Sequence, residues 1–403
     1  MLMLILDGLP DRPLDGRTPL SVAKKPNLDK IAELGINGIM DTISPGTRPG
    51  SDTSHLALLG YDPYRYYTGR GPIEAMGVGI DLQPGDVAFR ANFATVSGSG
   101  EIFEKEVIDR RAGRIEETSE LIKELNEISL PVSFRVAKAT GHRAVVVFRS
   151  VFSADVTDTD PKKIGEKVRK CRPLDNSANE LAKIVNEFMQ KAHEILERHP
   201  ANSERERKGL PKANALLLRG AGVMKEVPSF KEKYNSKLTI VSATALIKGV
   251  GRMVGGETLT PEGATGNKKT DLRAKITAGI EALRRSDVVL VHIKAPDELG
   301  HDRDFNGKVE FIEKLDPYLK PLLDLDRSSN CIIATSDHST PVKVGEHTAD
   351  PVVVSILHED VRRDEVKRFS EFEAYKGGLC RIRGMELLNI ALDLLNIVKK
   401  FGA

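Results

Sequence analysis

Largely apolar strands that stand next to carboxylates and histidines constrain the fold of this sequence more than any other feature. Four such strands are predicted, at residues 1–6, 287–293, 331–335 and 352–356. Strands of this kind are typical of parallel sheets that are buried on both faces. Segments with helical spacing separate them, and this alternation predicts an α/β domain with a parallel sheet.

Potential metal ligands stand next to each of these strands. In open α/β sheets, ligands bind beyond the carboxyl ends of the strands. Carboxylate and imidazole groups together suit Zn²⁺, Mn²⁺, Fe²⁺ or Co²⁺. Each residue alone has an ordinary alternative, such as a turn residue, a helix cap or a surface histidine, but the combination predicts a metal site. The ligand set is Asp7, Asp297, His301, Asp337, His338 and His347.

A serine in the loop at residues 49–55 (PGSDTSH) is a candidate nucleophile. Ser51 follows Pro-Gly and opens a short helix, where backbone N–H groups can hold a phosphate. A metal bound to the hydroxyl would lower its pKa and activate it. The alternative is that Ser51 caps the helix, since serine is a favoured N-cap residue, and the two roles are compatible.

The middle of the chain has a different pattern, which predicts an inserted α+β domain at residues 79–232. Residues 1–78 and 233–403 would then form the α/β domain. The insertion contains predicted strands at 87–95, 132–136, 144–148 and 215–218, and predicted helices at 115–128 and 178–198. Residues 44–72 and 200–212 are predicted to be mainly loop, and residues 385–401 a C-terminal helix.

Positive charge collects at a few places in or near the insertion. The sequence DRRAGR at 109–114 contains Arg110, Arg111 and Arg114, which could bind an oxyanion through paired hydrogen bonds. The alternative is an ordinary solvated charge cluster. Arg219, at the predicted end of a strand, and Lys248, near the predicted end of the sheet, add to this charge.

Composition excludes several classes of protein. Sixty Lys and Arg against 58 Asp and Glu give a net charge of +2, which argues against nucleic-acid binding as the main role. No apolar run reaches the roughly 18 residues that a membrane-spanning helix needs. The three cysteines are far apart and fit a reducing cytoplasm. We therefore expect a cytoplasmic protein; the sequence leaves its oligomeric state open.

Ten motifs, taken in order, resemble one family, the archaeal-type cofactor-independent phosphoglycerate mutases of the alkaline phosphatase superfamily. The resemblance covers nearly the whole chain and implies a mostly parallel, alkaline-phosphatase-like sheet flanked by helices, with an inserted α+β domain. The motifs are LDGLPDRP at 6–13, PGSDTSHLALLGYDP at 49–63, GRGPIEAMGVG at 69–79, DRRAGRI at 109–115, ATGHRAVVV at 139–147, LLLRGAG at 216–222, TPEGATG at 260–266, PDELGH at 296–301, SDHSTP at 336–341 and KGGLCRIRG at 376–384.

The resemblance implies an isomerase of glycolysis and gluconeogenesis. Such an enzyme interconverts 3-phosphoglycerate and 2-phosphoglycerate through a phosphoserine, here Ser51, and needs no 2,3-bisphosphoglycerate. Two divalent metal ions are implied, with Mn²⁺ favoured and Co²⁺, Mg²⁺, Zn²⁺ and Fe²⁺ also compatible. One metal would be held by Asp297, His301 and His347, and the other by Asp7, Ser51, Asp337 and His338. The glycerate would be bound by Arg110, Arg111, Arg114, Arg219 and Lys248.

The alternative is another metal-dependent phosphoryl-transfer enzyme of the same superfamily, a phosphatase or a phosphopentomutase. The metal motifs cannot separate these activities, and the inserted domain is what distinguishes them. If water reached the phosphoserine, the enzyme would be a phosphatase. A mutase is therefore expected to close its site during transfer.

Overall fold

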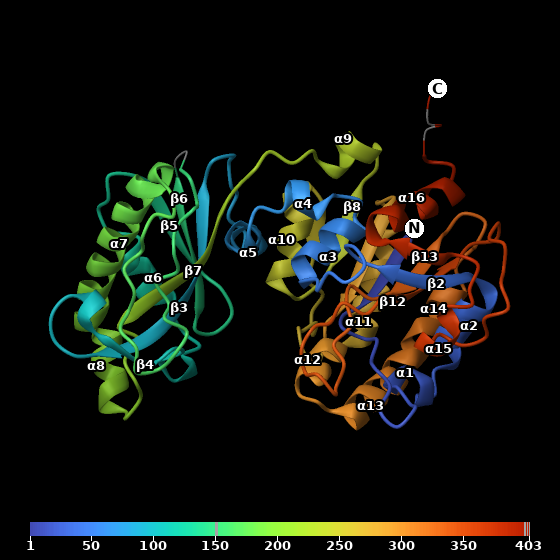
Figure 1. The fold of residues 1–403 in the computed structure, drawn as a ribbon, viewed down its shortest axis with the longest axis horizontal. Coiled ribbons are helices and arrows are strands. Elements are labelled where there is room, and N and C mark those ends of the chain that lie inside the picture. The colour runs from blue at the N-terminus through green and yellow to red at the C-terminus, as the bar shows by residue number, and fades with distance from the viewer. Residues whose placement is uncertain (150–151, 399, 401, 403) are drawn as a thin grey trace. The chain divides into compact units, whose positions relative to one another are not determined.

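The chain forms two compact units in the computed structural model, which describes residues 1–149, 152–398, 400 and 402 (Figure 1). The first unit contains Met1–Tyr67 and Val227–Ala403, and the second contains Thr68–Glu226. The sequence pattern predicts these divisions after residues 78 and 232. The first division falls earlier because helix α5 (Arg70–Gly77) packs on strands β3 (Val87–Ser97) and β7 (Ala215–Val223) of the second unit.

An eight-stranded sheet forms the centre of the first unit. Strand β1 lies inside it, between β10 and β11, and pairs with both in parallel. Only β12 runs antiparallel to its two neighbours, β11 and β2. The predicted mostly parallel sheet is therefore confirmed. The order of strands is β13 (Cys380–Arg383), β2 (Ile36–Asp41), β12 (Val352–Leu357), β11 (Ile332–Thr335), β1 (Leu2–Leu6), β10 (Val288–Ile293), β8 (Leu238–Val241) and β9 (Glu257–Leu259).

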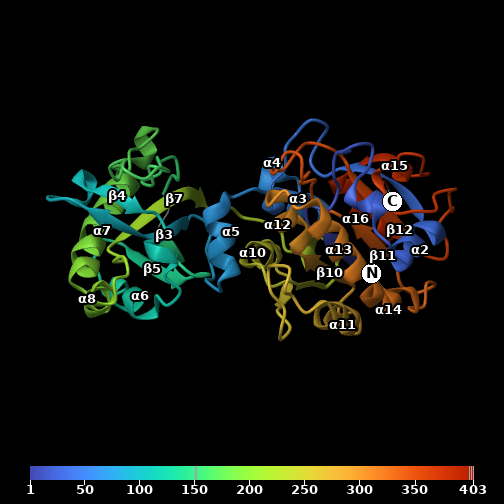
Figure 2. The same ribbon diagram turned by 90° about the horizontal axis from the view of Figure 1, so that it is seen from below.

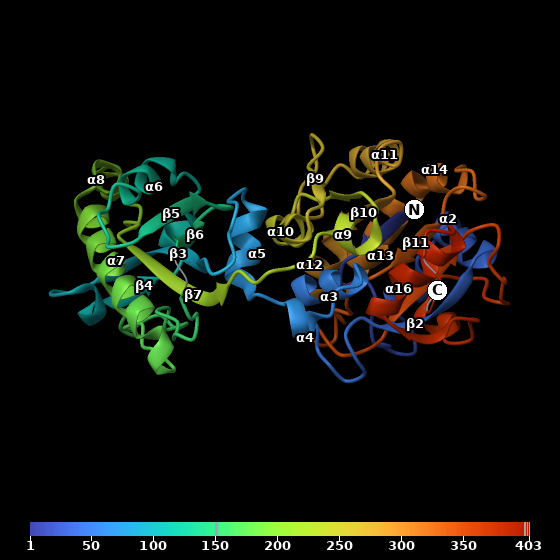
Figure 3. The same ribbon diagram turned by 90° about the horizontal axis from the view of Figure 1, so that it is seen from above.

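Helices bury this sheet, which explains why its central strands are largely apolar. Leu2, Leu4 and Leu6 of β1 pack into a core with helices α2 (Pro26–Leu34), α11 (Leu272–Ala282) and α13 (Phe305–Leu315). Helix α13 lies beside α12 (Ala295–His301), as Figure 2 shows. Helix α3 (Ser51–Leu58) contacts both α10 (Ala245–Met253) and α16 (Gly384–Leu394), and Figure 3 shows α3 and α16 side by side.

The second unit is an antiparallel sheet with helices, the predicted α+β insertion. Its long strand β3 pairs with β4 (Glu106–Asp109), β6 (Arg143–Arg149) and β7, and β6 also pairs with β5 (Ser133–Lys138). Helices α6 (Ser119–Leu125) and α7 (Asn179–Arg198) contribute to its core. There Phe188 of α7 meets the edges of Phe134 and Phe148 from the sheet.

Two segments predicted to be mainly loop contain more helix than the short one expected after Ser51. Residues 44–72 include α3, α4 (Pro63–Tyr66) and the start of α5, and residues 200–212 include α8 (Pro200–Arg207). The loop prediction rested on the many Gly, Pro, Ser and Thr residues of the first segment and on the charged residues of the second. In α8, proline takes the first helical position, where it costs no hydrogen bond, and His199 caps the N–H of Ala201.

Strand and helix ends also differ from the predictions. Strand β7 continues to Val223, so Arg219 lies inside the strand and not at its end.

Strand β2 was missed because Asn37 interrupts its apolar pattern. In the fold the side chain of Asn37 is buried and hydrogen-bonded to Ser355, Asp364 and the backbone. The predicted helix at 115–128 is limited to α6. The predicted helix at 385–401 ends at Leu394, and residues 399 and 401 lie outside the described residues.

Among the described residues, no helix combines the length and the apolar character needed to cross a bilayer. This agrees with the apolar runs of the sequence, all of which are short. The long helix α7 has charged residues along one side, and its buried residues belong to the core of the second unit.

Replacing Leu4 by Ala should lower the free energy of unfolding by about 2–5 kcal/mol, because Leu4 is fully buried in the central strand and its removal leaves a cavity. Leu14→Ala is the control, since this leucine of the same unit is 40% exposed and should change stability by about 0.5 kcal/mol or less. Guanidinium denaturation followed by circular dichroism measures both. Equal effects would contradict the assigned burial.

Candidate active site

The predicted ligands meet at one edge of the first unit's sheet because of strand direction. Asp7 follows β1, Asp297 lies in the helix after β10, and Asp337 with His338 follows β11. These three strands are parallel, so their carboxyl ends lie at the same edge. Strand β12 runs the other way, and therefore His347, which precedes it, reaches that edge as well.

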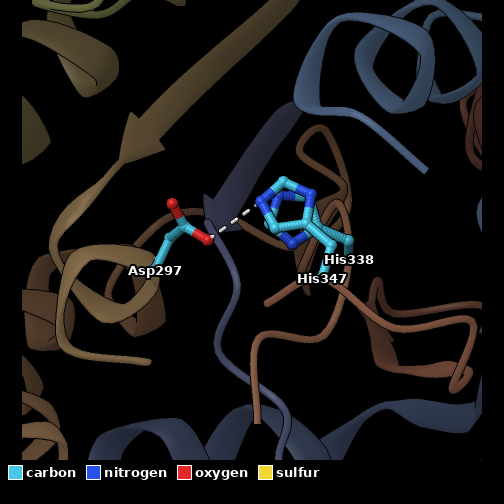
Figure 4. A group of neighbouring side chains, drawn as sticks. All are labelled: Asp297, His338 and His347. Atoms are coloured by element: carbon cyan, nitrogen blue, oxygen red, sulfur yellow. Dashed lines mark ion pairs between the residues drawn. The ribbon is translucent and has the colours of Figure 1, made fainter. Parts of the chain in front are cut away.

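Asp297, His338 and His347 form one group whose ligand atoms lie within 4.8 Å of one another (Figure 4). His347 Nε2 is 3.3 Å from Asp297 Oδ1, and the rings of His338 and His347 stack with centroids 3.6 Å apart. His301 Nε2 lies 3.4 Å from the same Asp297 oxygen. All three residues predicted to hold one metal are thus close together.

Asp7, Asp337 and His338 form a second group that shares His338 with the first. His338 Nε2 is 3.3 Å from Asp7 Oδ1 and 3.3 Å from Asp337 Oδ2. Ser51 Oγ lies 3.1 Å from the same nitrogen. The four residues predicted for the second metal therefore converge on one point, and His338 lies between the two groups.

Hydrogen bonds on the far side of three histidine rings direct the Nε2 atoms into the site. His347 Nδ1 donates to Pro49 O over 2.9 Å, and His301 Nδ1 donates to Gly345 O over 2.9 Å. Thr340 Oγ1, which donates to Asp297, can accept from His338 Nδ1 at 3.2 Å. In each neutral ring this leaves a lone pair on Nε2, the arrangement of a metal-binding histidine.

The charges of the site favour divalent cations. Asp7, Asp297 and Asp337 are buried carboxylates, and one ammonium group, that of Lys294, contacts two of them. Burial would raise the pKa of Asp7, but Lys294 and hydrogen bonds from His292 and His338 hold it well below its usual range. Burial and the charge of Asp7 raise the pKa of Asp337. Such buried carboxylates facing imidazole lone pairs fit metal ions, which would supply the missing positive charge.

Ser51 is the first residue of α3, and Gly50 takes the N-cap position. The alternative that Ser51 caps this helix is therefore wrong. Its side chain is buried beside His338, at the end of the helix where the dipole is positive. Position, burial and contact agree with the role predicted for it as a nucleophile.

Sequence reasoning missed several residues that support the ligands. Lys294 bridges Asp7 and Asp297. Burial alone would lower the pKa of Lys294, but these two carboxylates raise it. His292 Nε2 donates to Asp7 Oδ2 over 2.7 Å, and His55 Nδ1 donates to the carbonyl of Ser51 over 2.7 Å. Lys294 and His292 could have been found from their positions at the end of an apolar strand.

A cluster of arginines lies in the second unit. Arg219 is partly buried; burial and the charge of Arg90 lower its pKa, and its Nε has no hydrogen-bond partner in the described part of the chain. Glu74 pairs with Arg70 and Arg90, and Asp160 pairs with Arg110, so carboxylates are fewer than arginines. The cluster, hereafter the arginine cluster, consists of Arg70, Arg90, Arg110, Arg111, Arg143 and Arg219.

The structure does not group two predicted substrate residues with the arginine cluster. Arg114 is exposed in the short 3₁₀ turn Ala112–Arg114, and no ion pair joins it to the arginine cluster among the described residues. Lys248 lies within helix α10 of the first unit, and burial lowers its pKa. Their roles stay predictions.

Comparison with known proteins identifies the family. The sequence profile of a family described as 2,3-bisphosphoglycerate-independent phosphoglycerate mutase matches residues 32–202. A protein of Archaeoglobus fulgidus, named 2,3-bisphosphoglycerate-independent phosphoglycerate mutase 1, is 71% identical over 406 residues, which cover 100% of both chains. The chain belongs to the 2,3-bisphosphoglycerate-independent phosphoglycerate mutase family. A mutase of the same name from Methanopyrus kandleri is 49% identical over 416 residues, covering 100% of this chain and 98% of its own.

Solved structures extend the similarity to the fold. A cofactor-independent phosphoglycerate mutase from Thermoplasma acidophilum is 35% identical, with a TM-score of 0.73, over 98% of this chain and 99% of that chain. The PH0037 protein from Pyrococcus horikoshii is 40% identical, with a TM-score of 0.85. The match covers 100% of this chain and 98% of that chain. Both units therefore belong to the phosphoglycerate mutase fold, and the resemblance read from the motifs is confirmed.

Gly8→Ala should destabilise the fold and weaken metal binding, because a Cβ atom would lie 2.6 Å from Thr340 Oγ1 and 2.7 Å from Asp297 Cβ. Gly16→Ala is the matched control. Gly16 has a similar positive φ but no atom within 4 Å, so it should lose only about 1–2 kcal/mol of stability. Thermal unfolding and titration with Mn²⁺ measure both effects. Equal Mn²⁺ affinities in the two variants would contradict the close packing at Gly8.

Proposed function

We propose that this chain interconverts 3-phosphoglycerate and 2-phosphoglycerate through a phosphoserine on Ser51, without 2,3-bisphosphoglycerate. It would then be an isomerase of glycolysis and gluconeogenesis that acts on a small-molecule substrate. The observation that carries the proposal is the 3.1 Å contact between Ser51 Oγ and His338 Nε2, since His338 belongs to both carboxylate–histidine groups. A nucleophile next to two metal sites suits in-line phosphoryl transfer, because two ions can stabilise both the attacking and the leaving oxygen.

We propose that two divalent metal ions bind these groups, with Mn²⁺ preferred. Asp297, His301 and His347 would hold one ion, and Asp7, Ser51, Asp337 and His338 the other. When bound, the ions would act as Lewis acids that lower the pKa of the serine hydroxyl and neutralise charge on the phosphoryl group. The convergence of buried carboxylates and Nε2 lone pairs supports this assignment.

In the proposed reaction the Ser51 oxygen receives the phosphoryl group and later returns it. In the first step the Ser51 Oγ–P bond forms, the bond from phosphorus to the C3 oxygen breaks, and the serine proton ends on that oxygen. In the second step the C2 oxygen takes the phosphoryl group from Ser51, and its proton returns to the serine. The positive end of the α3 dipole, where Ser51 lies, would favour the phosphoserine.

Lys294 and His292 would support this chemistry through their contacts with the metal ligands Asp7 and Asp297. The ammonium of Lys294 lies against Asp7 and Asp297, one carboxylate from each proposed metal set, and offsets their repulsion. Burial lowers the pKa of His292 to about 4, so its ring is neutral and its Nε2–H can hold Asp7 in one orientation. Both side chains act on the ligands and not on the phosphoryl group.

We infer that the arginine cluster of the second unit binds the carboxylate and hydroxyl groups of the glycerate. The unpartnered Nε of Arg219 favours an anionic ligand, because a buried donor without a partner is costly. Arg111 and Arg143 also lack an ion pair in the described part of the chain. Burial lowers the pKa of His142 to about 4, and the nearby charges of Arg143 and Arg111 contribute to this shift. The cluster adds Arg70, Arg90 and Arg143 to the predicted residues.

Ser51→Ala should lower kcat for mutase turnover by at least about 10³-fold, because alanine has no hydroxyl to form the covalent intermediate. Ser54→Ala is the matched control, since Ser54 is a buried serine one turn further along α3. Acid quenching with 3-phosphoglycerate and peptide mass spectrometry should find phosphate on Ser51 in the wild type and in Ser54→Ala. Phosphate on another residue, or full turnover by Ser51→Ala, would refute the assignment.

Arg219→Met should raise KM for 3-phosphoglycerate about 10- to 100-fold, the effect of losing a hydrogen bond to a charged group. The thermal midpoint should change little, since Arg219 makes no ion pair among the described residues. Arg135→Met is the control, because Arg135 lies exposed on strand β5 of the same unit. Initial rates over a range of substrate concentrations decide the matter, and an unchanged KM in Arg219→Met would exclude this arginine from the substrate site.

A further inference from the structure

Lys308 of helix α13 forms a fully buried ion pair with Asp11. Its Nζ lies 3.0 Å from Asp11 Oδ2 and 3.0 Å from the carbonyl oxygen of Thr340, and neither charged side chain has exposed surface. Burying two charges costs desolvation free energy that their attraction often fails to recover. A pair of this kind is therefore weak evidence for a purely stabilising role, and its further contacts indicate another role.

Asp11 joins two loops that both carry proposed metal ligands. It lies in the loop that begins at Asp7, after β1. Its carboxylate accepts the backbone N–H of Val342, at 3.2 and 3.1 Å, from the segment that follows Asp337 and His338. The backbone N–H of Asp11 in turn donates to Glu371 Oε1 over 2.9 Å, which fixes the loop from the other side.

Thr340 connects the ion pair with the ligands themselves. Lys308 holds its carbonyl, while its hydroxyl donates to Asp297 Oδ1 over 2.6 Å. Its backbone N–H donates to Gly8 O over 3.2 Å, and the N–H of Gly8 donates to Asp337 Oδ1 over 3.2 Å. A chain of single hydrogen bonds therefore leads from Lys308 to a carboxylate of each proposed metal set.

The packing around Thr340 leaves little room for these contacts to shift. A Cβ atom on Gly300, in the helix that carries Asp297 and His301, would lie 2.2 Å from the Thr340 carbonyl oxygen. Helix α12 thus approaches this backbone as closely as a glycine permits. Movement of Thr340 would be passed on to the helix as well as to the Asp297 carboxylate.

We propose that Lys308 and Asp11 are positioning residues for the metal centre, whose ion pair holds the loops after β1 and β11 in the geometry that binds metal. The inference rests on the metal ligands of the proposed function. Groups that orient metal ligands from outside typically change metal affinity 10- to 100-fold when they are removed. Neither residue touches the substrate or the reacting atoms in this account.

Lys308→Met removes the charge and keeps most of the volume of the side chain. We expect the dissociation constant for Mn²⁺ to rise about 10- to 100-fold, measured from free Mn²⁺ by electron paramagnetic resonance, with thermal unfolding of the metal-free protein recorded in parallel. Lys25→Met is the matched control. Lys25 is also fully buried and paired with an aspartate, Asp29 at 2.8 Å, but it donates no hydrogen bond to either ligand loop among the described residues.

Asp11→Asn is a second, milder variant that keeps an oxygen for the N–H of Val342. It should also weaken Mn²⁺ binding, and it decides the question if Lys308→Met does not fold. Wild-type Mn²⁺ affinity in Lys308→Met and Asp11→Asn, or an equal loss of affinity in Lys25→Met, would overturn this inference alone. Failure of the wild type to bind Mn²⁺ would instead overturn the proposed metal site from which the inference starts.

Discussion

Repulsion among three buried carboxylates is the constraint on which the functional part of this molecule depends. Asp7, Asp297 and Asp337 are brought together by parallel strands that end at one edge of the sheet, in a place with little water to screen their charge. Lys294 offsets part of the repulsion, and histidine rings supply neutral donors and lone pairs around it. The remaining negative charge makes the site suited to divalent cations and, through them, to a phosphoryl group.

The two units divide the chemistry of the proposed reaction between them. In this account the first unit would provide the nucleophile and the metal ligands, and its buried sheet would hold those ligands in place. The second would provide cationic side chains, more numerous than the carboxylates that pair with them, and the Nε of Arg219, which has no hydrogen-bond partner in the described part of the chain. Family membership, which extends over both units, agrees with this division, since a mutase must recognise the glycerate as well as transfer its phosphoryl group.

Much of the fold and of the metal site could be predicted because apolar strands followed by Asp or His leave a strong local pattern. Ser51 was found from its Pro-Gly turn, although spacing could not show that Gly50 takes the cap position. Strand β2 was not predicted because Asn37 interrupts its apolar pattern. The side chain of Asn37 is hydrogen-bonded to Asp364 and Ser355, which are far away in sequence. The arginine cluster was found in part, because Arg90 and Arg143 join it through antiparallel pairing of β3 with β6, which no single-sequence pattern specifies.

The most direct test is the fate of the phosphoryl group in metal-stripped protein supplied with 3-phosphoglycerate and Mn²⁺, without 2,3-bisphosphoglycerate. Formation of 2-phosphoglycerate and release of free phosphate would be followed together. The account predicts isomerisation that depends on Mn²⁺, with little free phosphate. Phosphate release without isomerisation, or isomerisation that persists without any divalent ion, would contradict it.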